Sequence, residues 1–224
     1  MAPFATRAED LPAEFPVFPL PGALLLPRGK LPLNIFEPRY LALIEDALAA
    51  GRLFGMIQPD PSRPQGATGP ALFAVGCLGR LVSFSETDDG RYLVTLAGLT
   101  RFRVAAETTM RRGYRRVQAD FTEFTADLAP PPEAPAFDRT ALIADLRAYF
   151  THRGIDANWE AITKMPDHDL VVTLSMACPF EPPEKQALLQ APTPAERAAT
   201  LQALLRMDLH TPPSADETPR NRAS

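Results

Sequence analysis

The chain has 224 residues, of which 46% are hydrophobic and 22% charged, an ordinary composition for a globular protein of one large or two small domains. Its net charge of −4 argues against general affinity for nucleic acid, which requires a basic surface. The sequence has two distant cysteines, no secretory signal and no apolar run near the ~20 residues of a membrane helix. We therefore expect a cytoplasmic protein that does not enter a membrane.

The stretch Phe15–Tyr40 is apolar and interrupted by prolines. Because proline fixes φ and removes a backbone donor, the five prolines from Pro16 to Pro32 argue against a long helix and against an interior strand. We predict short extended pieces that open a strongly curved β-structure, at residues 17–18, 24–26 and 31–36. Residues 1–13, before this stretch, are expected to form a flexible terminus.

A helix is predicted to begin at Pro38, which suits the first helical position because its missing N–H costs nothing there. Apolar residues then recur at helical spacing from Tyr40 to Leu48, and Gly51 is a suitable left-handed stop.

Residues 52–124 contain strand-like runs separated by turn signals, beginning with RLFGMIQ. Asp89-Gly90 predicts a hairpin turn, since this pair tolerates positive φ. Gly98 is expected to interrupt the alternating run that starts at Arg91, and the last strand is expected over Tyr114–Phe124. Short strands with glycine breaks predict a small β-barrel with one embedded helix, over residues 14–125.

Composition changes at residues 126–135 (ADLAPPPEAP), which predict a semi-rigid linker. Beyond the linker every signal is helical, including a capping box at Thr193–Glu196 with proline at the first helical position. The sequence therefore predicts an α-helical bundle over residues 136–209. Residues 211–224 are expected to be a second flexible terminus.

No motif for catalysis, metal binding or a cofactor is present. Gly29-Lys30 lacks the spacing and the following hydroxyl of a phosphate-binding loop. The histidines have no partner at metal-ligand spacing; they are His152, His168 and His210. No nucleophile elbow surrounds a serine. We predict no catalytic residue, no metal site and no cofactor.

Six arginines lie between Arg101 and Arg116, and such a strip could contact RNA phosphates. The RNA-binding residues would be Arg111, Arg112, Arg115 and Arg116. Strand alternation, however, places Arg101 and Arg103 opposite apolar neighbours, as on a solvated outer face. The solvated face is the favoured interpretation, and RNA binding stays open as the alternative.

The residues at the predicted start of the helix form a second candidate site. A carboxylate at Glu37 is favoured by the helix dipole, and its pairing with Arg39 would brace the barrel. A structural role is favoured for this pair. The barrel–helix junction is nevertheless where we would look first for a polypeptide-binding groove, formed by Phe36, Glu37, Arg39 and Tyr40.

Several segments of the chain, in the same order, resemble the substrate-binding, amino-terminal domain of the ATP-dependent Lon protease. The resemblance rests on FPVFPLPGALLLPRGKLPLNIFEPRY, RLFGMIQP and GRYLVTLAGLTRFRV, in that order. The segments YRRVQADFTEF and DLVVTLSMACPFEPPEKQALLQAPTPAERAATLQALL extend it to free-standing bacterial members of the family, over residues 14–208. It implies an α+β fold, a PUA-like six-stranded barrel followed by a helical bundle.

The resemblance also implies a function without catalysis. Lon's ATPase needs a phosphate loop and its peptidase a Ser–Lys dyad, and no matching motif surrounds the lysines of this chain, Lys30, Lys164 and Lys185. We therefore expect no enzyme, but a module that binds unfolded or extended protein segments, possibly as an adaptor to a protease or chaperone.

Overall fold

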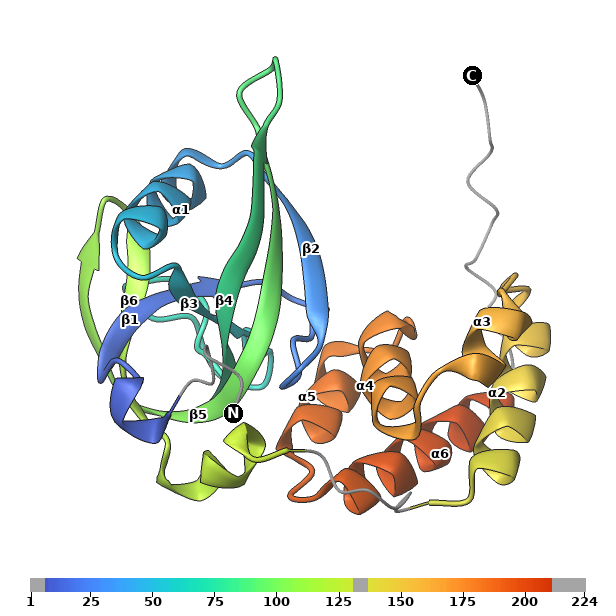
Figure 1. Cartoon of the computed structure of the whole chain (residues 1–224). Coiled ribbons are helices and arrows are strands. Elements are labelled where there is room, and N and C mark those ends of the chain that lie inside the picture. Colours follow the sequence, from blue (N-terminus) through green and yellow to red (C-terminus); the bar gives the residue numbers. More distant parts are fainter. Residues whose placement is uncertain (1–6, 131–136, 211–224) are drawn as a thin grey trace.

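The structure is a computed structural model that describes residues 7–130 and 137–210. It consists of a β-barrel lobe with one helix, followed by a helical lobe (Figure 1). Within the predicted flexible N-terminal segment, Ala8–Asp10 form a short 3₁₀ turn, η1. The predicted flexible residues 1–6 and 211–224, and residues 131–135 of the proline-rich linker, lie outside the described residues.

The barrel is built from six strands in the described part of the chain. They are β1 (Glu14–Pro19), β2 (Lys30–Ile35), β3 (Leu53–Ile57), β4 (Val75–Glu86), β5 (Tyr92–Arg111) and β6 (Tyr114–Asp120). Their order is β2-β5-β4-β3-β1-β6, and an additional pairing of β5 with β6 closes the ring. Strand β2 stands outside this ring and pairs with the first half of β5.

Strand β1 is an interior strand, so the prediction that its prolines exclude one is wrong. It pairs antiparallel with β6 through residues 14–17 and parallel with β3 through residues 17–19. Only Val17 therefore has a partner on both sides. Pro16 and Pro19 each face one partner, which lets an interior strand carry two residues that lack an N–H donor.

Strand β5 is continuous through Gly98, where we expected a break. A side chain at this position would overlap the carbonyl oxygen of Leu26, so glycine permits a close approach of two backbones. The last strand is also shorter than predicted. The carboxylate of Asp120 accepts a hydrogen bond from the Thr122 N–H at 2.8 Å, and a 3₁₀ helix, η2 (Thr122–Leu128), follows.

Helix α1 (Pro38–Ala49) begins at the predicted proline and ends before Gly51, which has φ of +82°. It buries one face against the barrel, and its Tyr40 ring lies 4.0 Å from the Phe18 ring, centroid to centroid. This packing anchors the chain that leaves β2.

The helical lobe contains five described helices. They are α2 (Arg139–Arg153), α3 (Trp159–Lys164), α4 (Asp167–Ala177), α5 (Pro182–Gln190) and α6 (Pro194–His210). The predicted capping box at the start of α6 is confirmed, since Glu196 N–H donates to Thr193 Oγ1 at 3.2 Å and Thr193 N–H donates to Glu196 Oε2 at 3.0 Å.

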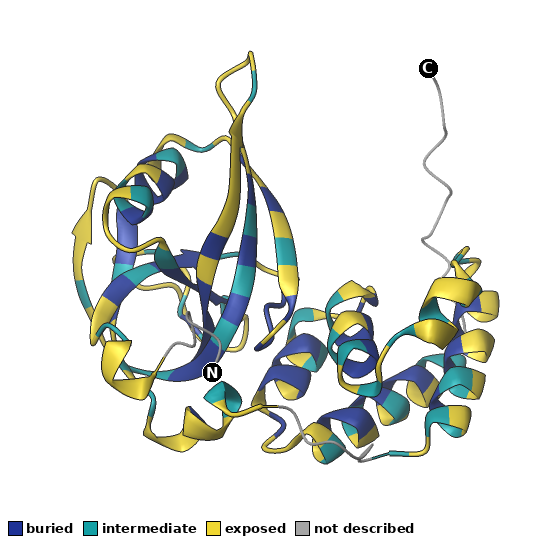
Figure 2. Cartoon of the chain, in the orientation of Figure 1, coloured by how far each residue is buried: buried dark blue, intermediate teal, exposed yellow. Residues whose placement is uncertain are grey.

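Both lobes contain buried residues (Figure 2). One buried cluster includes residues of both lobes, and a second, smaller cluster lies within the barrel. Polar contacts join them as well: the Lys185 ammonium donates to the Gly22 carbonyl at 2.6 Å, and the Gln186 amide donates to the Val75 carbonyl at 3.1 Å. The predicted domain limits, 14–125 and 136–209, stay predictions.

Candidate functional site

At the predicted barrel–helix junction, three of the four side chains contact one another. Glu37 and Arg39 form an ion pair of 2.8 Å, and the Arg39 guanidinium lies 4.5 Å from the centre of the Tyr40 ring. Tyr40 is buried, and this burial raises the pKa of its hydroxyl. Phe36 differs from the other three, because 64% of it is exposed. Glu37, Arg39 and Tyr40 thus form a structural contact at the junction, and Phe36 is an exposed apolar side chain beside it.

Each arginine of the proposed RNA-binding strip meets a carboxylate. Arg111 and Arg112 both bind Asp46, at 3.2 and 3.0 Å. Arg115 is buried and pairs with Glu107 at 2.6 Å. Arg116 pairs with Glu14 at 3.0 Å. These contacts leave little net positive charge for phosphates, so the geometry weighs against an RNA site.

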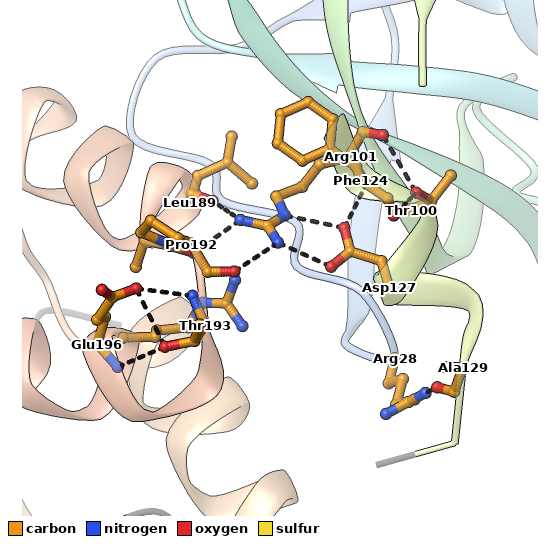
Figure 3. A network of polar contacts seen from close by, with 12 residues as sticks. Arg28, Thr100, Arg101, Phe124, Asp127, Ala129, Leu189, Pro192, Thr193 and Glu196 are labelled. Carbon is orange, nitrogen blue, oxygen red and sulfur yellow. Dashed lines mark hydrogen bonds and ion pairs between the residues drawn. The ribbon is translucent and has the colours of Figure 1, made fainter. Parts of the chain in front are cut away.

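The prediction of a solvated outer face is wrong at Arg101, because only 4% of this residue is exposed. Figure 3 shows its guanidinium reaching from β5 into the helical lobe. It forms two bonds of 2.8 Å with Asp127 and donates to the carbonyl of Ala191 at 2.7 Å. It also donates to the carbonyls of Leu189 and Pro192, at 3.2 and 3.3 Å. Arg101 is therefore a structural connection between the lobes.

The reason is that η2 and the segment between α5 and α6 cover the outer face of β5 at this point. Strand alternation indicates which side of the sheet a residue occupies, but it does not indicate what lies against that side. Arg103, two residues along the strand, is only partly buried and pairs with Glu123 at 2.7 Å.

One open edge of the sheet is at β2. On one side β2 pairs with β5, and no other described strand pairs with its opposite side. A turn leads into the strand: Gly29 N–H donates to the Leu26 carbonyl at 2.9 Å, Pro27 is second in the turn, and Arg28 has φ of +70°. Proline second and positive φ third are typical of a type II turn.

The register shows which backbone groups of β2 are available. Gly98 N–H donates to the Gly29 carbonyl at 2.9 Å, and hydrogen-bonded pairs alternate along an antiparallel ladder. The groups of Leu31, Leu33 and Ile35 therefore point toward β5. Those of Lys30, Pro32 and Asn34 point away from it, and all three of these side chains are exposed. The open edge thus offers two N–H donors and three carbonyls, because Pro32 has no N–H.

Beside this edge, the hairpin of β4 and β5 projects from the barrel and is exposed over much of its surface (Figure 2). Asn34 of β2 lies opposite Leu93 of β5, so the two side chains share the outer face of the sheet. Leu93 is 46% exposed. It lines a hollow of ≈ 420 Å³ together with Asn34, Thr87, Asp88, Asp89 and Arg91.

We call the open side of β2, with Phe36, Leu93 and this hollow, the β2 edge site. Of its side chains only Phe36 was among the predicted site residues. Along the strand Leu93 alternates with Tyr92, Val94 and Leu96. This alternation indicated that Leu93 lies on the opposite face of the sheet from those three residues. Its position beside Asn34 depends on strand register, for which the sequence holds no comparable signal.

No chemical reaction is indicated by the residues that the structure describes. They include no group of three or more His, Cys, Asp or Glu residues placed to hold a metal ion. Both cysteines are buried; burial raises the pKa of the Cys77 thiol and raises that of Cys178 to about 12, so neither is an activated nucleophile. Within residues 7–130 and 137–210, no helix is long and apolar enough to cross a membrane.

The architecture defines the class: a PUA-like six-stranded barrel with an embedded helix, joined to a helical bundle. The model of one protein family, the ATP-dependent protease La (LON) substrate-binding domain, matches residues 14–207. The chain belongs to this family. The part of Lon that it matches is the substrate-binding domain and not a catalytic one.

Curated relatives are longer proteins. Lon protease 2 of Myxococcus xanthus is 27% identical over 121 residues, which are 54% of this chain and 14% of that protein. Lon protease 2 of Sorangium cellulosum is 36% identical over 110 residues, 46% of this chain and 13% of that protein. The chain thus spans a small part of the length of these relatives.

Solved structures support the fold over most of the chain. A Lon N-terminal domain protein from Xanthomonas campestris has a TM-score of 0.55 at 23% identity, covering 85% of this chain and 97% of that one. The N-terminal domain of a Mycobacterium avium complex Lon protease has a TM-score of 0.57 at 16% identity, covering 86% and 98%.

Proposed function

We propose that this chain is a non-enzymatic module that binds unfolded or extended polypeptide at the β2 edge site. The observation that carries the proposal is the unpaired side of β2 beside two exposed apolar side chains, Phe36 and Leu93, in a member of a substrate-binding family. An extended segment would add to β2 as a further strand. Main-chain hydrogen bonds would supply affinity, and the side chains beside the edge would supply selectivity.

The open edge offers a direct test through one backbone donor. Asn34→Pro removes an N–H that points away from β5, and it leaves the bonds between β2 and β5 in place. Because one net hydrogen bond is worth about 0.5–1.5 kcal/mol, we expect the affinity for a fluorescein-labelled unfolded polypeptide to fall by about 2- to 10-fold. Fluorescence anisotropy titration measures this change.

Asn34→Ala is the matched control, because it removes the same side chain and keeps the N–H. Its affinity should stay close to that of the unmodified protein, apart from any contact made by the amide group. Equal affinities for the Pro and Ala variants would contradict strand addition at this edge. Absence of saturable binding to several unfolded polypeptides would contradict the proposed function as a whole.

The proposal extends to a role as an adaptor that passes bound segments to a protease or chaperone, and to a cytoplasmic location where such segments occur. The family match and the two free, buried cysteines support this extension. The test is the rate at which a Lon protease degrades an unfolded substrate with and without this chain. Faster degradation is expected, and an unchanged or slower rate would contradict the adaptor role.

A further inference from the structure

The hollow beside β2 is lined by one acidic side chain that forms no hydrogen bond or ion pair with its described neighbours. Among its lining residues, Asp89 and Arg91 neutralise each other, with Arg91 Nε donating to Asp89 Oδ2 at 2.6 Å. Asp88, next in the same turn, is exposed and has no hydrogen-bond or ion-pair partner among the residues that the structure describes. The hollow therefore has one unpaired negative charge.

The wall of the hollow is apolar at Leu93 and carries an amide at Asn34, whose side chain has no hydrogen-bond partner in the described part of the chain. A side chain that suits these surroundings has an apolar stem for the leucine and a positive end for the aspartate. Lysine and arginine have this composition, since their methylene stems pack on apolar surface while the charged head stays in water.

The spacing of strands also favours a long side chain. A segment added to the open side of β2 would lie about 4.8 Å from β2 and about 9.6 Å from β5, because neighbouring strands are separated by about 4.8 Å. The residue opposite Asn34 would share its face of the sheet, and therefore the face of Leu93. Only a long side chain would extend across Asn34 into the hollow.

The following inference rests on the proposed function. We propose that the hollow between β2 and the β4–β5 hairpin selects extended segments that place a lysine or arginine opposite Asn34. Asp88 is the group that recognises the positive charge of that side chain. The module would then distinguish apolar segments that contain a basic residue from those that contain a neutral or acidic one.

The experiment uses three labelled peptides of the same extended, apolar sequence that differ at one central residue, which is lysine, glutamine or glutamate. Anisotropy titrations are made with the unmodified chain and with Asp88→Asn. Asparagine is chosen because it also favours turns. Exposed ion pairs contribute weakly, so we expect the lysine peptide to bind about 2- to 5-fold more tightly than the glutamine peptide, with the glutamate peptide weakest.

Asp156→Asn is the matched control, since Asp156 is an exposed acid on the helical lobe and the net charge of the protein changes equally. The lysine advantage should disappear in Asp88→Asn and remain in Asp156→Asn. An advantage that persists in Asp88→Asn, or one that both variants lose, would overturn the role of Asp88. Asp88→Ser gives a second neutral variant if Asp88→Asn fails to fold.

The outcomes separate this inference from the function on which it rests. If all three peptides bind with equal affinity, polypeptide binding stands and charge selection by the hollow is wrong. If none of the peptides binds, and unfolded polypeptides also fail to bind, the proposed function is wrong and the inference fails with it.

Discussion

The two halves of strand β5 are both extended backbone in the same sheet, but they have different neighbours. From Thr100 to Arg111 the strand pairs first with β4, as far as Arg103, and then with β6, and its arginines form ion pairs with carboxylates. From Tyr92 to Ala97 it lies between β4 and β2, and beyond β2 the sheet is open. The arginines of the second half therefore form structural contacts, whereas the first half, which has fewer charges, lies beside the open edge of β2. A conspicuous charge pattern is thus a poor guide to a binding site here.

The largest effect is expected from breaking the buried connection in the second half of β5. Arg101→Ala removes the guanidinium that donates to the Asp127 carboxylate and to the carbonyls of Leu189 and Ala191, and it leaves Asp127 only the backbone N–H of residue 101. Removing one partner of a buried ion pair costs about 3–5 kcal/mol, so we expect a loss of this size in the free energy of unfolding. Urea denaturation measures it.

Arg103→Ala is the control from the same strand, since this arginine is only partly buried and its ion pair with Glu123 is open to solvent. An exposed pair contributes about 0–1 kcal/mol, and the control should lose no more than that. Similar losses for both variants would mean that burial of Arg101 does not distinguish the two positions.

An intermediate effect is expected at Asp46, where α1 meets the arginines of the second half. The Tyr114 hydroxyl donates to this carboxylate at 2.6 Å, and together with Arg112 and Arg111 it lowers the pKa of Asp46 below its ordinary value of 3.8. A carboxyl whose pKa is lowered by folding stabilises the native state above its unfolded pKa. This stabilisation is lost as the pH falls through the folded pKa.

Asp46→Asn should therefore be less stable than the unmodified chain at neutral pH, and the difference should shrink as the pH falls below about 4. Urea denaturation at a series of pH values measures it. A difference that stays constant down to pH 2 would contradict a role for the ionised carboxylate.

The smallest effect on stability is expected in the open half. Leu93→Ser changes an exposed side chain, so the free energy of unfolding should change by no more than about 0.5 kcal/mol. Affinity for unfolded polypeptide should nevertheless fall, because the apolar wall of the β2 edge site is lost. Met110→Ser, an exposed apolar residue in the other half of β5, is the control and should leave both quantities unchanged.

Local signals in the sequence predicted the elements whose causes are local. Pro38 marked the start of α1, Asp89-Gly90 the hairpin turn, and Thr193 with Glu196 the start of α6. In each case the residues that determine the structure lie within a few positions of one another.

The failures concern residues whose role depends on distant segments. Pro16 is tolerated because β1 changes partners along its length, and Gly98 continues a strand because Leu26 approaches it. Arg101 is buried because the helical lobe covers it. The same limit applies to the candidate site: Phe36 was predicted from its position in the chain, but the neighbourhood of Asn34 and Leu93 exists only through strand register.

Pro32 has a consequence for how the open side of β2 would behave among many unfolded chains. An edge with a complete row of donors and acceptors is a template on which strands can stack without limit, as in fibrils. The missing donor at the centre of β2 interrupts that row, so an added segment is held at both ends of the strand and weakly between them. If β2 binds unfolded chains as proposed, such an edge would favour brief, reversible binding and would not act as a template for their aggregation.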